Sequence, residues 1–151
     1  MNLYVKKTGM AATISIILLT LIFLITIIMY PMEAYYSAAS FLDQFDIADL
    51  WPVIPSFLLV LANIPLFAAL YFYSPGESKI FALTGTLFGA GYMICSGTNY
   101  FIQLGMLARN ISEPDSFIIS TFIMANPGSF ACAIDKLGYL FLSLSFLAFS
   151  G

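Results

Sequence analysis

An uninterrupted apolar stretch near the start of the chain limits what this sequence can fold into. Residues 11–30 read AATISIILLTLIFLITIIMY and contain no charged residue. A helix needs about 20 apolar residues to cross the hydrocarbon core of a membrane, whereas the apolar part of a secretory signal peptide has about 7–15. We therefore expect a first membrane-spanning helix over about 11–30 that also directs insertion.

The composition of the whole chain indicates the same class of protein. Of the 151 residues, 61% are hydrophobic and 9% are charged. Soluble domains contain about 45–50% apolar and about 25% charged residues. The sequence therefore predicts an all-α fold, a multi-pass transmembrane helix bundle that forms a single integral membrane domain over residues 1–151. The lipid bilayer is its expected surrounding.

Further apolar stretches complete a set of four spans. The expected spanning helices cover about 11–30, 51–73, 80–107 and 127–149. Residues 35–50 mix aromatic and acidic residues at helical spacing, which is typical of a short helix in the membrane interface. We place this helix in the first outer loop. A second short piece over 117–125 is expected to be interfacial or re-entrant.

The C-terminal part allows a different division. Phe117–Ile134 would be the fourth span, and Leu137–Ser150 would begin a fifth after a reversal at Asp135–Lys136. No turn residue accompanies that reversal, which favours four spans. In the four-span division, Asn126 caps the last helix and Pro127 takes its first position, as both residue types prefer.

Charge and residue usage exclude several kinds of site. The five basic residues are scattered, and the chain contains no histidine. Nucleic-acid binding requires clustered basic residues, and histidine is the commonest metal ligand and general base. Cys95 and Cys132 stand far apart with no metal-binding spacing. We expect no nucleic-acid partner, no metal site and no cofactor.

The basic residues also predict an orientation, because Lys and Arg accumulate on the cytoplasmic side of membrane proteins. A cytoplasmic N-terminus places Lys6, Lys7 and Lys79 inside and Arg109 outside. Four passes then return the C-terminus to the cytoplasmic side. We expect a plasma-membrane protein whose outer side carries six acidic residues, namely Glu33, Asp43, Asp46, Asp49, Glu113 and Asp115.

The third expected span carries a polar stripe. Tyr92, Ser96, Asn99 and Gln103 follow one another at i, i+4, i+7 and i+11 and so share one helix face. Gly85 and Gly89 continue this face as a GxxxG pair. Small and amide residues of this kind join membrane helices to one another, and they also line ligand sites. We regard Gly85 and Gly89 as helix-packing residues and the four polar residues as candidate ligand contacts.

Asp135 is the sharpest candidate for a site. An ionisable residue in a spanning helix costs at least about 2.5–3.5 kcal/mol at the bilayer centre, so it should face the bundle and find a partner. We expect Asp135 to turn towards Asn99, Gln103 or Arg109, while Lys136 extends its longer side chain to the interface. Asp135 is then either a structural hydrogen-bonding carboxyl or a ligand- or proton-binding one.

Three functions follow from these features. The first is a non-enzymatic membrane protein, namely a subunit, a scaffold or a self-associating homo-oligomer. The second is a transporter or binding protein for a small polar or lipid ligand, which would use Asp135 and the polar stripe. The third is a membrane enzyme with Asp135 as acid or base beside Tyr92 or Tyr100, although no spacing in the sequence requires it.

The four-span division predicts the side on which the chain ends. A fluorescent protein fused after Gly151 should fluoresce in the cytoplasm, and a phosphatase fused at the same place should be inactive. The opposite pair of results would contradict the four-pass orientation.

Overall fold

The computed structural model describes residues 3–31, 35–107, 109 and 115–150, and these are mainly helical. Of the acidic residues assigned to the outer side, Glu33 and Glu113 lie outside the described residues. The helices, in chain order, are α1 (Leu3–Met29), α2 (Ala38–Gln44), η1 (Ile47–Leu50), α3 (Val53–Tyr73), η2 (Gly76–Ser78), α4 (Lys79–Ile102), the π-helical turn η3 (Gln103–Leu107), α6 (Ser116–Phe122) and α7 (Phe130–Phe149).

Four stretches of the described chain are long and apolar enough to cross a membrane. They contain α1, α3 with η1, α4 with its flanking turns, and α7. The all-α, multi-pass bundle predicted from the sequence is confirmed, and its four apolar helices indicate a membrane-embedded protein. α7 runs without a break through Asp135 and Lys136, so the division into five spans is wrong.

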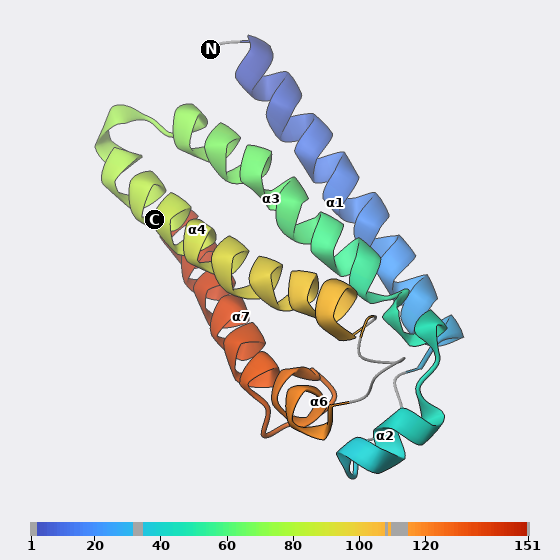
Figure 1. The fold of residues 1–151 in the computed structure, drawn as a ribbon. Coiled ribbons are helices and arrows are strands. Elements are labelled where there is room, and N and C mark those ends of the chain that lie inside the picture. The colour runs from blue at the N-terminus through green and yellow to red at the C-terminus, as the bar shows by residue number, and fades with distance from the viewer. Residues whose placement is uncertain (1–2, 32–34, 108, 110–114, 151) are drawn as a thin grey trace.

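The long helices pack mainly in the order α1, α3, α4 and α7 (Figure 1), and α7 also contacts α3 where Phe146 and Phe149 lie beside Phe67. α1 packs against α3, α3 against α4, and α4 against α7. Ala12 is the one buried residue of α1, and the outward side of this helix is apolar. Apolar side chains on such a surface are expected where lipid replaces water.

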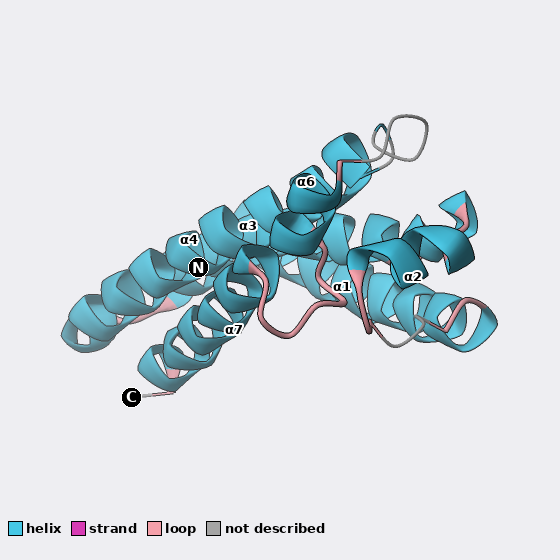
Figure 2. Cartoon of the chain, turned by 60° about the horizontal axis from the view of Figure 1, so that its bottom comes forward, coloured by secondary structure: helices cyan, strands magenta, loops and turns pink. Residues whose placement is uncertain are grey.

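One end of the bundle carries α2, η1 and α6, seen from below in Figure 2, and we call it the α2/α6 end. Phe41 of α2 packs with Ile119 and Ile123 to form a small apolar cluster there. Two acidic residues of this end cap short helices. Asp46 accepts from the backbone N–H of Ala48, and Asp115 accepts from the N–H of Phe117. Such caps satisfy N–H groups that a helix start leaves free.

The start of the last helix differs from the prediction. α7 begins at Phe130, and its N-cap is Ser129, whose hydroxyl accepts from the N–H of Cys132. Asn126 instead closes a turn by accepting from the N–H of Gly128, and its amide donates to the carbonyl of Ser120. These bonds tie Asn126 to the segment that leads into α7, three residues before the cap.

Glycines mark the closest contacts between the long helices. A Cβ on Gly89 would lie 2.5 Å from the ring of Phe67 on α3, and one on Gly85 would lie 3.0 Å from the ring of Phe149 on α7. The Gly85/Gly89 face is therefore covered by helices of the same chain. At Gly138 of α7, a Cβ would overlap Ser96 Oγ and lie 3.2 Å from the backbone nitrogen of Ser96.

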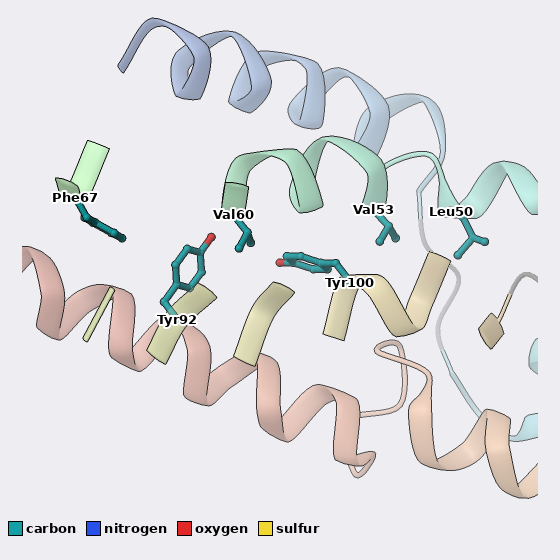
Figure 3. Packing of buried hydrophobic residues seen from close by; sticks show 6 residues of the cluster. All are labelled: Leu50, Val53, Val60, Phe67, Tyr92 and Tyr100. Atoms are coloured by element: carbon teal, nitrogen blue, oxygen red, sulfur yellow. The ribbon is translucent and has the colours of Figure 1, made fainter. Parts of the chain in front are cut away.

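The main apolar core follows α3 and α4 through the length of the bundle. Figure 3 shows its six buried members in a row. They are Leu50, Val53, Val60, Phe67, Tyr92 and Tyr100. The two tyrosines thus contribute their rings to the core, and their hydroxyls need polar partners inside the bundle.

Replacing Gly138 should weaken the contact between α4 and α7. Gly138→Val forces a branched side chain against the backbone of Ser96, and overpacking of this kind costs about 1–3 kcal/mol. The control is Gly76→Val, because a Cβ on Gly76 meets no atom within 4 Å. Unfolding in mixed micelles should show the loss for Gly138→Val alone; equal stability of both variants would contradict the close contact.

Candidate functional site

The polar stripe of α4 faces the interior of the bundle. Ser96 and Asn99 are each 0% exposed, and Tyr92 and Gln103 are buried as well. This burial follows from the spacing, because one face of α4 is enclosed by α3 and α7. Buried polar groups are costly unless they are hydrogen-bonded. The partners of each side chain therefore show what the stripe does.

Gln103 is committed to the backbone of the segment between α6 and α7. Its Nε2 donates to the carbonyl of Phe122 over 2.6 Å, and its Oε1 accepts from the N–H of Met124 over 3.3 Å. A backbone donor and a backbone acceptor together fix which way the amide of Gln103 points. Gln103 therefore anchors this segment to the end of α4.

The orientation of Gln103 sets that of Asn99. Nε2 of Gln103 also donates to Oδ1 of Asn99 over 3.3 Å. Because Oδ1 is used in this way, Nδ2 of Asn99 is left to present its N–H groups elsewhere. Nδ2 is buried and has no hydrogen-bond partner among the described residues. Asn99 therefore offers donors, and not a metal-binding oxygen, to its surroundings.

Asp135 is placed by α7 opposite these donors. It is the sixth residue of the helix and is half-buried. Its carboxylate interacts with the side chains of Asn99, Ser96 and Tyr100 on α4. The geometry stops short of hydrogen bonds, since Asp135 Oδ1, Asn99 Nδ2 and Ser96 Oγ are buried without a partner within the described chain. Three complementary polar atoms thus meet at one point of the α4–α7 interface.

Tyrosines surround this point. The hydroxyls of Tyr100 and Tyr139 lie 3.0 Å apart and form a hydrogen bond between α4 and α7. The ring of Tyr92 lies 6.2 Å from that of Tyr139, centroid to centroid. Tyr100 and Tyr92 are buried, whereas Tyr139 is 48% exposed. The cluster therefore extends from the interior of the bundle to its surface.

A second polar contact joins the same two helices near their other ends. The hydroxyl of Ser145 donates to the carbonyl of Gly85 over 2.7 Å. Gly85 is thus covered by the backbone of Ser145, and Gly89 is covered by the ring of Phe67. The predicted packing glycines and the predicted polar residues occupy the same covered face of α4.

The structure brings the five candidate ligand residues into one neighbourhood, but they have different partners. Ser96, Asn99, Tyr92 and Asp135 lie together, whereas Gln103 contacts only Asn99 of this group and also bonds to the α6–α7 segment. The sequence patterns did not indicate Tyr139, Gly138 and Ser145. A repeat could have revealed the buried face of α7, because its three buried residues recur every seven positions, at Ala131, Gly138 and Ser145.

The chemistry open to this arrangement is limited. No group of three metal-ligating side chains occurs among the described residues. Cys95 and Cys132 are both free thiols. The cluster combines one carboxylate, one amide donor and several hydroxyls, which suits hydrogen bonding between helices or the recognition of a small polar group.

Comparison of the chain with protein-family models, with curated proteins and with solved structures finds no match.

Removing the Gln103 amide should loosen the segment between α6 and α7. Gln103→Leu leaves the N–H of Met124 and the carbonyl of Phe122 without their partner, and each unsatisfied buried group costs about 1–3 kcal/mol. Thr98→Val, at an exposed position of α4, serves as the control. Hydrogen exchange at residues 119–126 should speed up in Gln103→Leu alone. Unchanged exchange would show that Gln103 does not hold this segment.

Proposed function

We propose that this chain is a non-enzymatic subunit or scaffold of a membrane assembly. The observation that carries the proposal is that buried polar side chains at the end of α4 and on α7 hold the fold together. Gln103 holds a loop, Tyr100 bonds to Tyr139, and Ser145 bonds to the backbone of Gly85. Side chains committed in this way serve packing rather than turnover of a substrate.

The open row of helices supports association with another membrane protein. α1 stands at one end of the row and packs against α3, and α7 stands at the other end against α4. A groove of about 360 Å³ lies between α1 and α3, and one of about 490 Å³ lies between α3 and α4. Both are lined mainly by apolar side chains, which suit a partner helix or a lipid chain.

The distribution of charge supports the orientation proposed from the sequence. Lys6 and Lys7 lie in the first turns of α1, and Lys79 begins α4 at the same end of the bundle. The acidic caps Asp46 and Asp115 lie at the α2/α6 end. We propose that the end with the lysines faces the cytoplasm of a cell whose plasma membrane holds the protein.

The proposed subunit role predicts an assembly larger than one chain. After mild extraction from its native membrane, the full-length chain should migrate in native electrophoresis above a monomeric four-span protein of equal length. Chemical cross-linking before extraction should yield the same larger species. Migration as a single chain under both conditions would contradict the proposal.

A second function is favoured by the three unpartnered atoms at Asp135. A carboxylate, an amide donor and a hydroxyl that converge without mutual hydrogen bonds also provide contacts for a small polar ligand. The partial exposure of Asp135 gives such a ligand access from the edge of the α4–α7 interface. This candidate is a transporter or binding protein in which Asp135 takes up a cationic group or a proton.

Asp135→Asn separates the two functions, with Asp43→Asn on exposed α2 as the matched control. If Asp135 is structural, any fall in the cellular level of Asp135→Asn should be accompanied by a fall in its unfolding temperature. Small amines should then leave the unfolding temperature of the wild type unchanged. An amine that stabilises the wild type and Asp43→Asn, but not a normally folded Asp135→Asn, would instead establish ligand binding.

A further inference from the structure

Two opposite charges lie within the body of one spanning helix. Asp135 and Lys136 are the sixth and seventh residues of α7, about 8–9 Å along the helix from its start. Lys136 is exposed, and Asp135 is half-buried. The other lysines of the described spans, by contrast, lie close to helix ends. α7 therefore presents charge on a surface that would otherwise face lipid, where charge is costly.

The two charges do not neutralise each other within one helix. Successive residues of an α-helix point about 100° apart, so the carboxylate and the ammonium diverge. Oδ1 of Asp135 is buried on the side of Ser96 and Asn99 of α4, while the residue as a whole is only half-buried. Lys136 points to the outside of the bundle. Each charge lacks an opposite charge on its own chain among the contacts described above.

A stripe of exposed residues includes Lys136 along one edge and has Asp135 beside its other edge. Lys136, Tyr139, Ser143 and Phe146 are exposed and follow one another at spacings of three, four and three. This spacing produces one continuous face for helix–helix packing. Around the helix axis, Tyr139 lies between the two charges, about 40° from Asp135 and about 60° from Lys136. The charges therefore lie at opposite edges of the stripe.

This pattern is complementary to itself. Two copies in one membrane have the same orientation, so their Asp135 and Lys136 residues lie at the same depth. A twofold axis along the membrane normal brings the Asp135 edge of each copy beside the Lys136 edge of the other. Both carboxylates and both ammonium groups then face opposite charges. Ser143, a small residue within the stripe, allows the two backbones to approach.

We propose that the stripe formed by Lys136, Tyr139, Ser143 and Phe146 binds a second copy of this chain, with Asp135 of each copy facing Lys136 of the other. The inference rests on the proposed subunit function and names the partner. It also gives the polar residues on the exposed side of α7 a role that lipid does not provide. α7 is available for this contact because it ends the row of helices.

Cross-linking tests the position of the interface. Ser143→Cys, in the full chain with Cys95→Ala and Cys132→Ala, should form a disulfide-linked dimer in liposomes under mild oxidation. The matched control is Thr20→Cys on α1. Like Ser143, Thr20 is exposed and its hydroxyl donates to a carbonyl four residues earlier in its own helix. The control should form no disulfide-linked dimer.

Charge reversal tests the ion pairs. Lys136→Glu should weaken dimerisation by roughly tenfold or more, measured by energy transfer while the protein is diluted in lipid. Lys136→Arg should preserve it, and Lys7→Glu provides an equal change of charge at the end of α1. Circular dichroism should show unchanged helix content for Lys136→Glu, because the side chain is exposed.

The outcomes separate the inference from the function on which it rests. Cross-linking at Ser143→Cys together with weakening by Lys136→Glu supports the α7 dimer. A dimer that forms through Thr20→Cys, tolerates Lys136→Glu, or is replaced by a different chain bound to α7 overturns the inference and leaves the subunit function standing. A chain that is monomeric at every lipid dilution and binds no other protein overturns both.

Discussion

The close contact between α4 and α7 is the interaction on which the rest of the structure depends. Gly138 brings the backbone of α7 against Ser96, at a distance that leaves no room for a side chain. In a membrane there is little hydrophobic drive between helices, so packing and hydrogen bonds must hold them together. This contact sets Asp135 opposite Asn99 and places Ser145 above the carbonyl of Gly85.

A series of hydrogen-bonded amide groups connects the α2/α6 end to the interior of the bundle. The backbone around Met124 orients Gln103, Gln103 orients Asn99, and Asn99 turns its N–H groups away from that contact, on the side where Asp135 lies. Each step follows from the donor and acceptor inventory of the side chain before it. The interior of the protein therefore has a fixed polarity, with donors aimed at the one acidic residue of α7.

Much of the fold was predictable because the hydropathy of a short stretch of sequence indicates whether that stretch spans the membrane. The apolar stretches predicted four spans, and the i, i+4, i+7 spacing placed Ser96 and Asn99 on one face of their helix. The start of α7 was not predictable in the same way. Asn126 and Ser129 are both good N-cap residues by type. Ser129 is the N-cap of α7, because the side chain of Asn126 is bonded to the carbonyl of Ser120 instead. That carbonyl belongs to another helix, which no local pattern describes.

Length and hydropathy are enough to make this chain an all-α membrane protein with an acidic residue in its last span, because they set the free-energy cost of leaving water. The neighbour of each helix, by contrast, is set by contacts between residues far apart in the sequence. These contacts cover Gly85 and Gly89 within the chain, give Gln103 to a loop, and leave Lys136 on an open surface. The physical reason is that a helix face has a periodicity in sequence, whereas its partner is chosen by shape and hydrogen bonding between distant residues.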